Sequence, residues 1–106
     1  MNHHKYSIIM TTTASQDDAK EIANLLLEGR LAACVQIFPV LSLYTWEGKV
    51  NEDLEHILFI KAKNADYAAI ETAIKEKHKY DVPEIIRVPI VGGSASYLSW
   101  VDEITE

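Results

Sequence analysis

The chain has 106 residues, 48% hydrophobic and 25% charged, which is an ordinary composition for one soluble domain over residues 1–106. Its formal net charge of −6 argues against nucleic acid or an anionic membrane as the main partner, because either needs a cationic protein face, and it leaves cations as candidate ligands. A single cysteine excludes an internal disulfide, and no apolar run is long enough for a signal peptide or a membrane span. We therefore expect a cytoplasmic protein.

The first elements along the chain are a strand and a helix. The β-branched and apolar run at 6–12 predicts a strand. Ser15 and Asp18 have the spacing of a capping box, and Gly29 can end the helix that follows, so we expect a helix over about 16–28. Its apolar residues recur at the helical period of i, i+3, i+4 and i+7: Ala19, Ile22, Ala23 and Leu26.

A long hairpin is predicted next. Alternating residues at about 32–46 and 49–63 read as two paired strands, and 47–49 is the one turn signal between them. Pro39 cannot donate a hydrogen bond to a ladder, so it marks an edge strand or a bulge.

The C-terminal part of the chain predicts a helix, a strand and a last short helix. Asn64 can cap the first helix, which runs to about residue 78, and a strand follows at 84–90. Ser94 can cap the last helix. The order β-α-β-β-α-β predicts an α+β, ferredoxin-like sandwich with a long central hairpin.

The hairpin is longer than one small domain can cover. Two strands of about 15 residues span on the order of 50 Å, whereas a domain of 100 residues has a radius of gyration of about 13 Å. The far end is too apolar to remain in water, since it carries Leu41, Leu43, Tyr44, Trp46 and Val50. We expect this end to be covered by other copies of the chain. In the alternative, Pro39 folds the strand back and leaves two shorter strands.

Three stretches together resemble the CutA family of divalent-cation tolerance proteins: "RLAACVQIFPVLSLYTWEGKV" at 30–50, "KYDVPEIIRVPI" at 79–90 and "YLSWV" at 97–101. The resemblance implies a ferredoxin-like homotrimer with its hairpins packed around the three-fold axis, and a role in the response to copper and other divalent ions. It also implies copper ligands at the end of the first strand and in a pair before a tyrosine. In this sequence those positions hold Thr11, Lys77 and His78, so one imidazole of the implied set is retained.

His78 has two interpretations. It can be a metal ligand, as the resemblance implies. It also lies four residues after Ile74, on the apolar side of the helix end, where a protonated imidazole gains about 0.3–1 kcal/mol from the helix dipole. Pro83 further on pushes Val82 out of the helical region and sets the entry to the strand.

A group of aromatic and charged residues is a candidate subunit interface or inter-subunit cleft: Tyr44, Trp46, Glu47, Lys49, Tyr80, Glu84 and Trp100. Trimeric PII-type signalling proteins, which are similar in architecture, hold small ligands in such clefts, so a small-ligand sensing module is the alternative function. Asp81 and Glu84 lack a visible nucleophile partner. We therefore expect no enzyme and no obligatory cofactor, with copper or another divalent cation as the metal ligand.

The amino terminus offers a second candidate metal site. His3 is third from a free amine when Met1 is retained, which the bulk of Asn2 favours. The amine, two deprotonated amides and the imidazole of His3 can form the square-planar nitrogen set that Cu(II) and Ni(II) favour.

Overall fold

The computed structural model describes residues 4–106. The strands are β1 (Tyr6–Thr13), β2 (Cys34–Trp46), β3 (Lys49–Lys63) and β4 (Ile85–Pro89). The helices are α1 (Gln16–Glu28), the short 3-10 helix η1 (Asn64–Asp66), α2 (Tyr67–Lys77) and α3 (Ala95–Ile104). The predicted order of elements is confirmed, and each boundary lies within two residues of its prediction, apart from η1, which the sequence did not predict.

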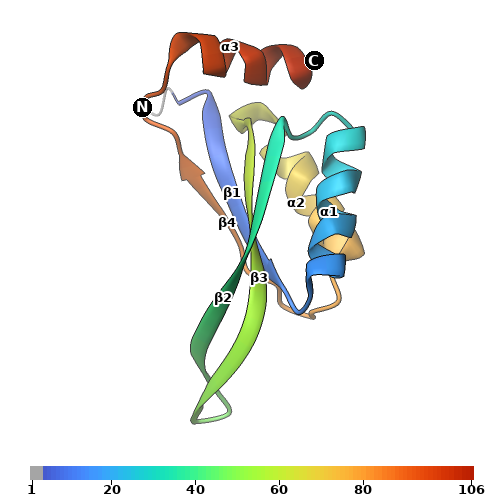
Figure 1. The fold of residues 1–106 in the computed structure, drawn as a ribbon, viewed down its shortest axis with the longest axis vertical. Coiled ribbons are helices and arrows are strands. Elements are labelled where there is room, and N and C mark those ends of the chain that lie inside the picture. Colours follow the sequence, from blue (N-terminus) through green and yellow to red (C-terminus); the bar gives the residue numbers. More distant parts are fainter. Residues whose placement is uncertain (1–3) are drawn as a thin grey trace.

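The four strands form one antiparallel sheet in the order β2-β3-β1-β4, with α1 and α2 against one face (Figure 1). α3 lies across the end of the sheet opposite the hairpin tip (Figure 1). The helix-covered face holds the core, in which the side chains of Ile9, Leu58 and Ile60 are completely buried. The predicted apolar stripe of α1 packs here, and α2 contributes Ile70 and Ile74.

The hairpin is one continuous ladder, as predicted. Its register runs without interruption from Cys34 opposite Lys61 to Trp46 opposite Lys49. Glu47 and Gly48 make the turn with φ angles of 51° and 76°, as a two-residue turn of type I′ requires. Pro39 lies in β2, an edge strand, and does not fold the strand back, because the missing N–H of an edge position can face outward.

Of the two helix caps predicted for α1 and α2, the structure confirms the first and not the second. The Ser15 hydroxyl accepts a hydrogen bond from the Asp18 amide at 3.1 Å, so the predicted cap of α1 is confirmed. Asn64 does not cap α2. Its side chain instead accepts from the Ser7 hydroxyl and donates to the His4 carbonyl at 2.9 Å, which ties η1 to the start of β1. A tertiary contact has replaced the local one.

The outer part of the hairpin extends beyond the helices (Figure 1). The molecule measures 44 × 30 × 22 Å, and its longest dimension agrees with the expected strand length. Large apolar side chains remain exposed at this tip, among them Trp46 at 63% and Val50 at 73%. In the part of the chain from residue 4 onward, no helix is long and apolar enough to cross a membrane.

Candidate functional site

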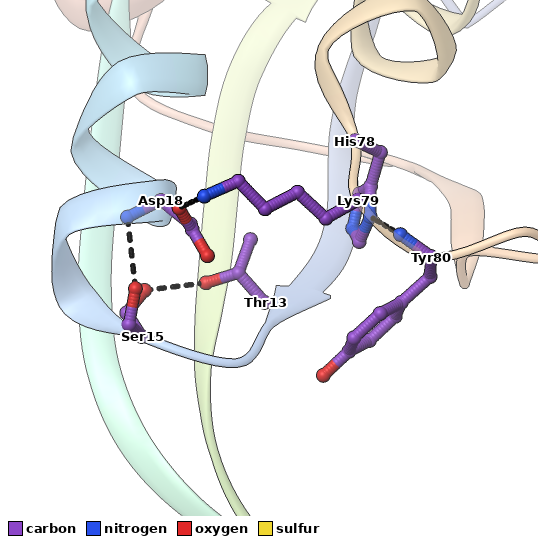
Figure 2. Close-up of polar contacts among 6 residues, drawn as sticks. All are labelled: Thr13, Ser15, Asp18, His78, Lys79 and Tyr80. Atoms are coloured by element: carbon purple, nitrogen blue, oxygen red, sulfur yellow. Dashed lines mark hydrogen bonds and ion pairs between the residues drawn. The ribbon is translucent and has the colours of Figure 1, made fainter.

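His78 joins the end of α2 to β1. Its backbone N–H caps α2 by donating to the Ile74 carbonyl at 2.8 Å. Its ring Nδ1 accepts the Tyr80 amide N–H at 3.1 Å (Figure 2). The proton of the ring therefore lies on Nε2, which donates to the Thr12 carbonyl at 2.8 Å. The His78 ring is therefore neutral, and not the protonated imidazole considered from the sequence, because a protonated Nδ1 could not accept a hydrogen bond.

The implied copper ligands do not form a metal centre. Both ring nitrogens of His78 are occupied by backbone groups. Thr11 is completely buried and its hydroxyl has no hydrogen-bond partner among the described residues, and Lys77 is exposed. Across residues 4–106, no three His, Cys, Asp or Glu side chains are grouped closely enough to hold a metal ion. His3 lies outside the described residues.

An ion pair holds the loop after α2 against α1. The Lys79 ammonium lies 2.7 Å from an oxygen of Asp18 (Figure 2). This contact lowers the pKa of the Asp18 carboxyl, assisted by the hydrogen bond from Ser15, and raises the pKa of Lys79. The Tyr80 side chain points away from this pair (Figure 2). His78 and Lys79 thus fix the backbone from which Tyr80 projects to the other face of the sheet.

A pocket of about 500 Å³ lies where the hairpin leaves the body of the molecule, and Tyr80 forms part of its wall. We call it the Tyr80 pocket; it is lined by Thr12, Tyr44, Trp46, Asp53, Glu55, Tyr80, Asp81, Val82 and Glu84. Strand alternation explains the grouping, because Asp53 and Glu55 are two residues apart on β3 and share a face.

Two tyrosine–carboxylate pairs organise the pocket. The Tyr80 hydroxyl donates to Glu55 at 2.8 Å, and the Tyr44 hydroxyl donates to Asp53. Burial, and then the bond to Glu55, raise the pKa of Tyr80. The bond to Asp53 is the main cause of the raised pKa of Tyr44. Both hydroxyls therefore remain protonated at neutral pH and act as donors, while the carboxylates supply negative charge.

The structure brings together part of the group predicted from sequence. Tyr44, Trp46, Tyr80 and Glu84 line the pocket. Within one chain, Glu47 and Lys49 lie at the hairpin turn, and Trp100 lies on α3 beside Tyr97, with ring centroids 5.7 Å apart. The sequence analysis missed Thr12, Asp53 and Glu55, although two acids at alternate positions of a strand were a usable signal.

Fold and pocket together define a small helix-and-sheet protein with a projecting hairpin and an acid-lined pocket at its base. Residues 7–104 match the family model of the CutA1 divalent ion tolerance protein. The chain belongs to this family.

Relatives and solved structures agree with this assignment. The divalent-cation tolerance protein CutA of Thermus thermophilus is 41% identical over 99 residues, which are 92% of this chain and 96% of that protein. The structure of the CutA protein of Archaeoglobus fulgidus, described as periplasmic, has a TM-score of 0.94 at 38% identity and covers 95% of this chain and 99% of that one. The chloroplastic CutA of Arabidopsis thaliana is 39% identical over 92% of this chain, which spans about half of that protein (54%).

Proposed function

We propose that this protein is a cytoplasmic homotrimer, not an enzyme, that takes part in the response to divalent metal ions by binding a cation in the Tyr80 pocket. The observation that carries the proposal is the set of four carboxylates around one pocket: Asp53, Glu55, Asp81 and Glu84. Neither ion pair among the described residues involves any of these four acids. A pocket with this charge attracts and concentrates cations.

Two bare surfaces support the trimer. Large apolar side chains are exposed on or beside the sheet face that α1 and α2 do not cover, namely Phe38, Ile86 and Val88. The hairpin tip exposes Leu41, Leu43 and Leu54. Apolar surface of this extent is typical of protein interfaces. The strand order β2-β3-β1-β4 further supports a ferredoxin-like single domain of the kind that the resemblance implies.

The donor atoms bear on the identity of the metal. The pocket offers carboxylate, phenol and hydroxyl oxygens, which suit hard divalent ions such as Mg²⁺ or Mn²⁺ better than copper. Because no three acids converge among residues 4–106, such an ion would keep part of its water shell and be held by one or two carboxylates. Copper binding would instead fall to the amino-terminal nitrogen set with His3. One residue added before Met1 should abolish tight Cu(II) binding there, whereas His78→Ala should preserve it. Titration of both variants with Cu(II), followed by absorption spectroscopy, separates the two sites.

A small-ligand sensing module is the second candidate function. The volume of about 500 Å³ favours it, because this exceeds the space that a single metal ion needs and lies in the range of small-molecule sites. In this candidate the response to metal ions would be an indirect consequence of a signal carried by an organic ligand.

The proposed function is tested by light scattering and calorimetry on the same sample. A homotrimer has a mass of about 36 kDa, three times the 11.9 kDa of one chain. Titration with Mg²⁺, Mn²⁺, Zn²⁺ and Cu²⁺ should give saturable binding that Glu55→Gln weakens. A monomer at micromolar concentration would refute the trimer, and binding unaffected by Glu55→Gln would refute the pocket as the cation site.

A further inference from the structure

The floor of the Tyr80 pocket contains a polar group without a partner. Thr12 lines the pocket and is only 7% exposed. Its backbone carbonyl accepts from His78, but its hydroxyl makes no hydrogen bond to any residue that the structure describes. Among the described residues, its oxygen is not one of the fully enclosed side-chain atoms that lack a partner, so it opens to the pocket and can form a hydrogen bond with a ligand there.

The charge of the pocket is not compensated within the chain. Glu55 is 9% exposed and receives a single hydrogen bond, from the neutral hydroxyl of Tyr80. Asp53 is bonded to Tyr44 in the same way. Among the described residues, no lysine or arginine lines the pocket. Burying the Glu55 carboxylate without a positive partner is unfavourable, and a bound cation would relieve that cost.

The walls of the pocket also include apolar groups. Tyr44, Trp46 and Tyr80 contribute aromatic rings, and Val82 contributes an aliphatic surface. No group of three His, Cys, Asp or Glu within residues 4–106 converges as a bare metal ion requires. Aromatic faces attract organic cations, and their edges and methyl groups pack against methylene carbons. The pocket therefore suits a cation that carries a carbon skeleton.

We propose that the Tyr80 pocket binds an aliphatic diamine or polyamine. The ammonium groups are held by the carboxylates on β3 and in the segment before β4, with the Thr12 hydroxyl accepting one N–H. The methylene chain lies against the rings of Tyr44, Trp46 and Tyr80. This assignment rests on the proposed function that the pocket takes a cation, and it specifies which class of cation.

Calorimetric titration of the assembled protein with putrescine, a four-carbon diamine, tests the proposal. Putrescine should bind saturably, and its affinity should fall as salt is added, because charge supplies most of the attraction. The corresponding butanediol, which keeps the chain and loses the charges, should not bind. Butanediol binding as strongly as putrescine would overturn the proposal, since the site would then recognise only the apolar chain.

Two neighbouring threonines provide a matched pair of variants. Thr12→Val removes the unpaired hydroxyl at nearly constant volume and should weaken putrescine binding roughly tenfold, as loss of a hydrogen bond to a charged group does. Thr11→Val removes another buried and unpaired hydroxyl, on the opposite face of the same strand, and should leave the affinity unchanged. Equal losses in both variants would overturn the role of Thr12.

A second pair of variants tests the contribution of a pocket carboxylate charge to putrescine binding. Glu84→Gln should weaken binding several-fold, whereas Glu103→Gln, at an exposed acid on α3, should not. Saturable metal binding without putrescine binding would refute this inference and retain the proposed function. Absence of both would refute both, and would be expected if a side chain of another subunit already fills the pocket.

Discussion

The two ends of the β2–β3 hairpin both carry apolar side chains on the same face, but their surroundings are opposite. Leu54 and Leu58 lie on the same strand and the same face, four residues or about 13 Å apart. Leu58 is completely buried under the helices, whereas Leu54 is 78% exposed. An alternating apolar pattern therefore predicts which face of a strand is buried, but not which element or molecule buries it. At one end the helices α1 and α2 cover this face, and at the other end no element of the described chain does, which is where the proposed assembly would cover it.

The opposite faces of the tip differ as well. The face that continues from the helix-covered side carries leucine and valine, namely Leu41, Leu43, Val50 and Leu54. The other face carries Tyr44, Trp46, Asp53 and Glu55, which line the Tyr80 pocket. One ribbon thus provides an apolar surface suited to assembly and a polar, aromatic surface suited to a ligand.

The largest expected effect comes from placing a charge in the tip. Leu43→Asp should destabilise the assembly by roughly 3–5 kcal/mol, because an unpaired charge would be buried at the interface. Light scattering over a dilution series should show dissociation at higher concentration than in the parent protein. Asp17→Ala, an exposed position on α1, serves as the control and should not change the mass. An unchanged assembly in Leu43→Asp would mean that the apolar face of the tip is not the assembly surface.

A pair of leucine truncations compares the two ends directly. Leu58→Ala should lower the free energy of unfolding by about 2–5 kcal/mol at every protein concentration, since it opens a cavity in the core of each chain. Leu54→Ala should act through assembly, so its cost should depend on protein concentration. Chemical denaturation at several concentrations measures both. If Leu54→Ala lowered the free energy of unfolding equally at every protein concentration, the interpretation of the tip as an assembly surface would be contradicted.

His78→Ala, near the helix-covered end of the hairpin, should lower the free energy of unfolding by an intermediate amount. The variant leaves the Thr12 carbonyl and the Tyr80 amide without their side-chain partner, at a cost of about 1–3 kcal/mol in the free energy of unfolding. Lys77→Ala, at the exposed neighbouring position, should change the free energy of unfolding by less than about 0.5 kcal/mol. Unchanged stability together with lost copper binding would instead identify His78 as a metal ligand.

The smallest effect concerns the Asp18–Lys79 ion pair, because the Lys79 side chain is largely exposed and salt screens the contact. The pKa of Asp18 is lowered by folding, so its contribution to stability is present above the unfolded pKa and is lost as the pH falls through the folded pKa. The stability difference between the parent and Asp18→Asn should therefore begin to shrink as the pH falls below about 4 and should vanish only below the lowered pKa of folded Asp18. A difference that grows with acidity would contradict this assignment.

The sequence by itself determined the elements and their order. Ser15 marked the start of α1 because capping is a contact between residues three apart, and Glu47–Gly48 marked the hairpin turn because few residues adopt positive φ angles. The family was also readable from three short motifs, and the family model confirms it. These features depend on interactions within a few residues of the chain.

Only the tertiary structure decided which side chains share a site. Thr12 and Glu55 are 43 residues apart along the chain and meet because β1 pairs with β3 in a register that places both on one face. The end of α2 likewise meets β1, where the ring of His78 reaches the Thr12 carbonyl, so the one imidazole kept from the implied copper site serves as a structural bridge. Register and packing arise from the sum of many contacts across the whole chain, and no local pattern encodes them.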